Sequence, residues 1–205
     1  MSAHRQLRTL DLSHNALESL DGLGTLECLA ELCVESNGLR SVGGLDGAPL
    51  LATVRAAHNA IERLDGLPAL AHLTALDVSD NLLSSLAGLH GCSGLMDLHA
   101  GRNAVANSNE MRHVAHLALL RTLDLSDNPV VHCGSEAVPY RVHVAQQLPS
   151  LVSLDGEPVS AEEKVGAAWH FGAADAELRR IRDKHLPAEG ILPAPPRPRV
   201  PLSAS

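Results

Sequence analysis

Leucine and other apolar residues recur at a constant spacing along the first 130 residues, and an asparagine follows them at a fixed place. The pattern L-x-x-L-x-L-x-x-N-x-L, with some Val, Ala and Ile substitutions, begins at residues 7, 29, 51, 73, 95 and 120. Four steps are therefore 22 residues long and one is 25. Within each copy, apolar and polar residues alternate over five positions, which predicts a short strand. The sequence predicts six stacked copies of one unit, each called a rung below.

The spacing assigns a place to both the leucines and the asparagine. Strand side chains alternate between two faces, so the leucines point into the core of a solenoid whose next strand lies about 4.8 Å away. The chain then turns, and an asparagine side chain can serve backbone groups that the turn leaves unpaired. The Gly–Leu half of each copy is expected to return over the opposite side in 3-10 or short helical turns. We predict a structural ladder of Asn15, Asn37, Asn59, Asn81, Asn103 and Asn128.

This repeat resembles the 22-residue class of leucine-rich repeats, and residues after the last rung resemble the C-terminal cap of such proteins. The similar families are the leucine-rich regulatory subunits of protein phosphatase 1, the outer-arm dynein light chain, and axonemal and spliceosomal leucine-rich proteins. The resemblance implies an α/β solenoid, a right-handed leucine-rich repeat superhelix with a concave parallel β-sheet and a C-terminal helical cap and extension. The cap residues are Tyr140, Arg141, Leu148, Pro149, Leu151, Leu154, Asp155 and Gly156.

The chain is expected to divide into four segments. Residues 1–135 hold the six rungs, and residues 136–159 form the cap, with a helix over 140–147 and a partial seventh rung. A helical extension over 160–186 begins with a capping box of Ser160 and Glu163 and reads as one helix to Gly172 and a second one after it. The proline-rich tail, 187–205, is expected to be disordered. Only six residues precede Leu7, which leaves open an uncapped first strand or a fragment of a longer protein.

Strand side chains that do not enter the core are predicted to form the binding surface. These positions, with the loop positions that follow them, carry eight carboxylates and two arginines, so the face is acidic and suits a basic partner surface. Aspartate is also ordinary in this repeat, whereas Arg55 and His99 depart from it. The candidate partner-binding residues are Asp11, Glu31, Arg55, Asp77, Asp97, His99 and Asp124.

Aromatic anchors, which often dominate interfaces, are missing from the predicted face. The chain has one tryptophan, one tyrosine and one phenylalanine. Trp169 and Phe171 lie in the helical extension. They either pack on the last rungs and the cap or form a second, weaker partner-binding arm.

Composition narrows the remaining functions. A net charge of −8 argues against a general nucleic-acid binder, which needs a basic surface. The four cysteines form no CxxC pair, as expected for reduced thiols in a cytosolic protein. No signal peptide, membrane-spanning run, metal-ligand spacing or catalytic motif is visible. We therefore predict no enzymatic activity, no cofactor, no metal site and no binding to membranes or nucleic acid.

These observations predict a non-enzymatic scaffold or adaptor that binds another protein. The resemblance favours a cytoskeletal or axonemal component, in the cytoplasm or the axoneme of a cilium or flagellum, with dynein, tubulin or another axonemal protein as partner. A regulatory subunit of a protein phosphatase and a nuclear or splicing scaffold remain alternatives.

Overall fold

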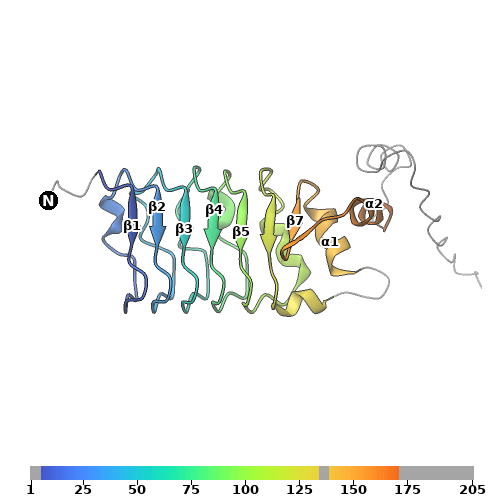
Figure 1. The fold of residues 1–205 in the computed structure, drawn as a ribbon, viewed down its shortest axis with the longest axis horizontal. Coiled ribbons are helices and arrows are strands. Elements are labelled where there is room, and N and C mark those ends of the chain that lie inside the picture. The colour runs from blue at the N-terminus through green and yellow to red at the C-terminus, as the bar shows by residue number, and fades with distance from the viewer. Residues whose placement is uncertain (1–5, 134–138, 171–205) are drawn as a thin grey trace, which may run out of the picture.

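The computed structural model describes residues 6–133 and 139–170, and its strands lie side by side in one sheet (Figure 1). The spatial order of the strands follows the chain from β1 to β8. Neighbours are parallel up to β7, and β7 and β8 are antiparallel. The strands are β1 (Thr9–Asp11), β2 (Glu31–Cys33), β3 (Thr53–Arg55), β4 (Ala75–Asp77), β5 (Asp97–His99), β6 (Thr122–Asp124), β7 (Ser153–Leu154) and β8 (Glu157–Pro158).

The register between strands equals the sequence period, as predicted. Leu10 pairs with Leu32, Leu32 with Val54, and so on to Leu123, which pairs with Leu154 of the seventh rung. The solenoid with a parallel sheet, predicted from the repeat, is confirmed. The antiparallel strand β8 was not predicted.

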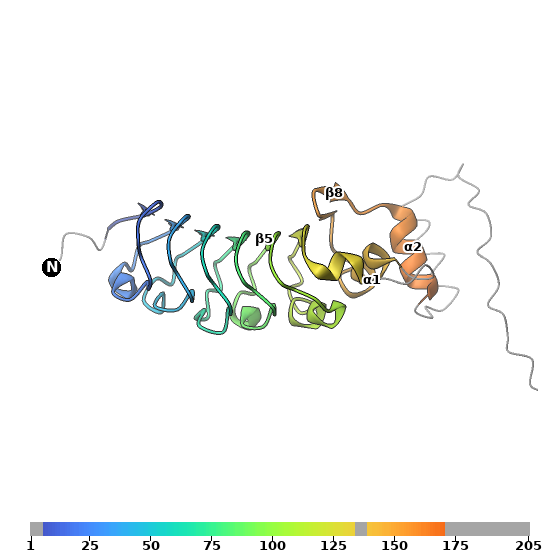
Figure 2. The ribbon, with the colours of Figure 1, turned by 90° about the horizontal axis from the view of Figure 1, so that it is seen from below.

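The sheet lies on one side of the solenoid, and the return segments lie on the other (Figure 2). Short 3-10 helices were expected there, and they occur in some rungs, while the rungs of β2 and β3 return through turns alone. The 3-10 helices are η1 (Leu23–Thr25), η2 (Leu89–Gly91), η3 (Ser108–His113) and η4 (Pro129–His132). Below, this side is called the convex side, and the opposite one the sheet face.

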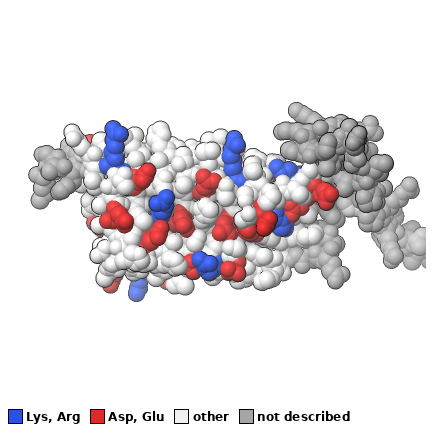
Figure 3. Space-filling view, in the orientation of Figure 1, with Lys and Arg blue, Asp and Glu red and all other residues white. Residues whose placement is uncertain are grey.

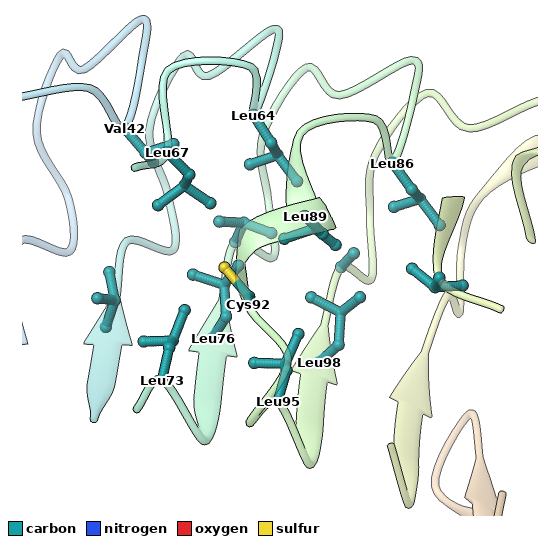
Figure 4. Packing of buried hydrophobic residues seen from close by; sticks show 14 of the residues in the cluster. Val42, Leu64, Leu67, Leu73, Leu76, Leu86, Leu89, Cys92, Leu95 and Leu98 are labelled. Atoms are coloured by element: carbon teal, nitrogen blue, oxygen red, sulfur yellow. The ribbon is translucent and has the colours of Figure 1, made fainter. Parts of the chain in front are cut away.

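The core is a single stack of apolar side chains between the two sides. Figure 4 shows Leu73, Leu76, Leu95 and Leu98 from the strand side meeting leucines from the convex side around Cys92. These core residues are fully buried, and each stabilises the fold by about 1.5–3 kcal/mol relative to an exposed side chain. Burial also raises the pKa of the Cys92 thiol, which keeps it in its unreactive protonated form.

The asparagine side chains connect each rung to the rung before it. Asn81 Nδ2 donates to the carbonyl oxygens of Val78 and Ser79 in its own rung and of Ala56 in the preceding one, each at 3.0 Å. Its Oδ1 accepts from the backbone N–H of Ile61 at 2.9 Å.

The same four hydrogen bonds recur at the four other asparagines from the second to the sixth rung. The carbonyls are shared, since Ala56 O accepts from both Asn59 and Asn81. With the described residues, Asn15 in the first rung makes only the two bonds within its own rung, to Leu12 O and Ser13 O. Of the six asparagines in the predicted ladder, five therefore make hydrogen bonds to the preceding rung and Asn15 does not. The repeated set belongs to Asn37, Asn59, Asn81, Asn103 and Asn128.

The parallel sheet stops where Asp155 turns the chain away. Asp155 and Gly156 both have positive φ, 55° and 80°. In an inner rung, the N–H of Ala100 donates to the backbone carbonyl of Asp124 at 2.8 Å. In the last full rung, the N–H of Leu125 donates instead to the Asp155 side chain, at 2.7 Å. Asp155 thus replaces the carbonyl that a further strand would supply.

Among the described residues, two α-helices follow the sixth rung, α1 (Tyr140–Gln147) and α2 (Ala161–His170), and they pack against each other. The helix expected over 140–147 is confirmed. The Ser160 capping box is also confirmed, because Ser160 N–H donates to Glu163 Oε2 at 2.7 Å and Glu163 N–H donates to Ser160 Oγ at 3.1 Å. The expected second helix, the tail over 187–205 and Phe171 lie outside the described residues. The division into four segments remains a prediction.

Arg141 joins the parts of this end. It donates to the carbonyls of Leu154 at 2.9 Å and Pro158 at 3.1 Å, and it forms an ion pair with Glu163 of α2. The side chains of Arg141 and Glu163 are 28% and 21% exposed. Burial raises the pKa of Glu163, but bonds from Arg141 and Ser160 outweigh it and lower the pKa overall. Arg141 therefore holds α1, β7, β8 and α2 together.

Candidate protein-binding face

The sheet face presents two rows of side chains, one from the first and one from the third residue of each strand. The register places each member beside its neighbour in the next strand, as expected from the repeat. Figure 3 shows acidic groups spread over the strands with fewer basic groups among them. The first row is Thr9, Glu31, Thr53, Ala75, Asp97 and Thr122, and the third is Asp11, Cys33, Arg55, Asp77, His99 and Asp124.

The aspartates of the third row also stabilise the turn that follows each strand. Asp77 Oδ1 accepts from the N–H of Ser79 at 3.0 Å, and Asp124 Oδ1 accepts from that of Ser126 at 2.9 Å. Asp11 makes the same bond to Ser13, and this bond is the main reason that the pKa of Asp11 is lowered. One carboxylate oxygen is thus used in an Asx turn. The D-x-S spacing signals this role, which the sequence analysis did not assign.

Arg55 and His99 interrupt the acidic third row. Arg55 is exposed between Cys33 and Asp77, and no ion pair of Arg55 occurs among the described residues. His99 lies between Asp77 and Asp124 in the register. Arg55 offers a positive charge to an approaching carboxylate. The two aspartates beside His99 attract an approaching cation.

The edge where the strands end carries a pair that sequence analysis missed. Arg102 Nε and Nη2 donate to Asp80 Oδ1 and Oδ2, both at 2.6 Å, and His58 Nδ1 lies 3.5 Å from Asp80 Oδ2. The Arg102 guanidinium holds the pKa of Asp80 below its usual range. These three residues follow the strands at equivalent positions, all with φ between 51° and 56°. The pair neutralises one carboxylate and one arginine of the face.

Replacing Arg102 with alanine should therefore leave the fold nearly unchanged. The Arg102 side chain is 59% exposed, and exposed ion pairs contribute little because water screens them. We expect the melting temperature to shift by about 2 °C or less, measured by circular dichroism. A fall of 10 °C would show that the pair is structural.

The second candidate surface consists of Trp169 and Phe171, of which Trp169 lies among the described residues. Trp169 is partly buried on α2, and α2 packs on α1. Its role, in packing on the cap or in a partner-binding arm, stays a prediction. Aromatic residues are absent from strands β1 to β6, and the exposed large apolar residues (Leu50, Leu82, Leu119 and Val152) are scattered over the described chain. The sheet face therefore presents charged groups more than apolar ones.

Metal and membrane sites were also considered. Within the described ranges, no three His, Cys, Asp or Glu side chains come together as metal ligands would. None of the described helices is long and apolar enough to cross a bilayer.

Known proteins share this architecture. The Leucine Rich Repeat family matches residues 6–26, and no curated protein matches significantly. An internalin of Listeria monocytogenes has a TM-score of 0.61 at 19% identity, over 78% of this chain and 45% of its own. A leucine-rich repeat protein of Leptospira interrogans has a TM-score of 0.60 at 23% identity, over 73% of this chain and 37% of its own.

A third similar structure matches this chain in length. It is the SNF/U2A′ complex of Drosophila melanogaster, with a TM-score of 0.51 at 20% identity, over 85% of this chain and 87% of the matched one. By contrast, this chain spans less than half the length of the internalin and of the Leptospira protein. Together with the parallel sheet, these similarities show that the chain has the leucine-rich repeat fold.

Proposed function

We propose that this chain is a non-enzymatic scaffold that binds another protein through its sheet face. The observation that carries the proposal is the set of carboxylates held in register on β1, β2, β4, β5 and β6. An open sheet face has no enclosed pocket that could exclude water from a reaction. It does present charges at the regular strand spacing of about 4.8 Å, which suits recognition of a second macromolecule.

The chemistry of the face favours a partner with a basic surface. Asp77, Asp97 and Asp124 form its densest acidic part, with His99 among them. Opposite charges on a partner would speed association and select against acidic proteins. Such binding should weaken as salt is added, because exposed charges are screened.

Asparagine substitutions at Asp77 and Asp124 test this face without disturbing its turns. Asparagine keeps the side-chain oxygen that accepts from Ser79 or Ser126 but removes the charge. We expect the double variant to retain about a tenth or less of its partner after affinity capture from lysate. The matched control, Asp21→Asn with Asp46→Asn, removes two exposed charges outside the strands. Equal capture by the two double variants, both with native circular dichroism, would exclude the sheet face.

The identity of the captured protein decides among the specific functions. Resemblance to dynein light chain and axonemal proteins supports a cytoskeletal or axonemal scaffold, in the cytoplasm or in a cilium or flagellum. Mass spectrometry would then find dynein, tubulin or another axonemal protein. Only splicing proteins, or only a phosphatase catalytic subunit, would refute the axonemal function.

A nuclear or splicing scaffold is the second candidate. The structure of the SNF/U2A′ complex supports it, because it is similar over most of both chains. A phosphatase regulator is a third candidate, which the resemblance supports through acidic residues but not through aromatic ones, since β1 to β6 have none.

A further inference from the structure

The two ends of the described solenoid differ. Asp155, β8 and the two helices close the C-terminal end. At the other end, no described residue covers the first rung. Five of its core leucines are therefore only partly buried, although Leu20 and Leu26 of the same rung are buried, and the equivalents of these five one rung later are fully buried. The partly buried residues are Leu7, Leu10, Leu12, Leu17 and Leu23, and the equivalents are Leu29, Leu32, Val34, Leu39 and Leu45.

The first strand also has an open edge. Arg8 O and Leu12 N bond to β2, so the backbone groups of Thr9 and Asp11 point to the opposite side. In β2, the equivalent positions are paired, since Glu31 N donates to Arg8 O and Cys33 O accepts from Leu12 N. Within the described ranges, nothing pairs with Thr9 and Asp11 in this way. Such an edge is a template for another strand.

We propose that a second copy of this chain binds here, with the two β1 strands antiparallel about a two-fold axis at Leu10. In this register Thr9 of each copy faces Asp11 of the other, and the pairs exchange four backbone hydrogen bonds. The two Leu10 side chains meet as a close, non-hydrogen-bonded pair and join the two cores. The sheets then continue from one molecule into the other.

Two features select a second copy over a foreign strand. The register is self-complementary, because the Thr9 hydroxyl can donate to Asp11 of the second copy and no two carboxylates oppose each other. In addition, the sheet ends at the other side in the two-residue strand β8, where Pro158 has no N–H to donate and its carbonyl accepts from Arg141, so this edge is blocked for head-to-tail growth. Pairing through the open ends alone is isologous, so assembly stops at a dimer instead of a fibre.

The mass of the full chain in solution tests this dimer. Sedimentation velocity over a range of concentrations should show a species of twice the 21.6 kDa chain mass. Thr9→Asp places two aspartates opposite each other at both symmetric positions, so we expect the dimer dissociation constant to rise about tenfold or more. Thr9→Lys creates an ion pair at the same places and should lower it. Thr53→Asp, at the same position two strands away, adds the same charge and should change nothing.

Amide hydrogen exchange tests the strand register. Exchange at Thr9 and Asp11 should slow as concentration rises, while exchange at Thr53 stays constant. A monomer at all concentrations would overturn the proposal. So would a dimer that responds equally to Thr9→Asp and Thr53→Asp, or one without concentration-dependent protection of Thr9 and Asp11. No other protein takes part in these measurements, so they are independent of the proposed scaffold function.

Discussion

Replacing Asn81 with alanine is expected to lower the free energy of unfolding by about 3 kcal/mol, because a buried hydrogen-bonding centre between two rungs is lost. Asn81 is 7% exposed and makes four hydrogen bonds to backbone groups. Alanine leaves Ile61 N–H without its acceptor and deprives three carbonyls of a donor. Urea unfolding followed by circular dichroism measures the change.

Asn15→Ala is the matched control for this substitution. Asn15 occupies the same place in its rung but is exposed, and its two hydrogen bonds to described residues are both local. Its replacement should cost about 1 kcal/mol or less. Equal losses for the two variants would mean that the contacts between rungs do not stabilise the solenoid.

Replacing Arg141 with alanine is expected to release α2 from the cap and to lower the free energy of unfolding by about 2 kcal/mol. The substitution removes a donor from the carbonyls of Leu154 and Pro158 and the cation from Glu163. A rise in amide exchange relative to the wild-type protein that is larger in α2 than in β3 would report the local release. Arg63→Ala removes a different arginine, whose side chain is 78% exposed, and should have no measurable effect.

Lowering the pH of the wild-type protein should also release α2 from the cap. The folded-state pKa of Glu163 lies below the ordinary value of 4.5. Its ionised form therefore stabilises the fold above pH 4.5, and this contribution is lost as pH falls through the lower folded value. Asp155 has the opposite sign, because burial raises its pKa and protonation favours the folded state. Protection factors of the α2 amides that stay constant in acid would argue against the Arg141 link.

The repeat in the sequence was sufficient to predict the register of the sheet. A leucine at residue 10, 32, 76 or 98 must face the core, and this fixes which residues share each row of the face. The helix predicted over 140–147 also matches α1. Periodicity worked here because each rung contacts mainly its neighbours.

Contacts between unlike residues could not be predicted in the same way. Arg141 and Glu163 lie after the repeats, so the period does not make them neighbours. Asp80 and Arg102 are made neighbours by the period, but the conformations of their side chains decide that they pair. Asp155 accepts from Leu125 because the chain leaves the sheet at that point. The periodic pattern ends there, so it gives no information about which group replaces the missing strand.

The sharing of carbonyls along the asparagine ladder has a consequence for how such a molecule can change in length. Each asparagine bonds to its own rung and to the preceding one, and each shared carbonyl accepts from two successive asparagines. The joint between any two inner rungs is therefore chemically the same. Removing a segment of 22 residues would bring together two rungs that already have matching donors and acceptors. The number of rungs can thus vary by duplication or deletion of one unit, and the extent of the charged surface varies with it.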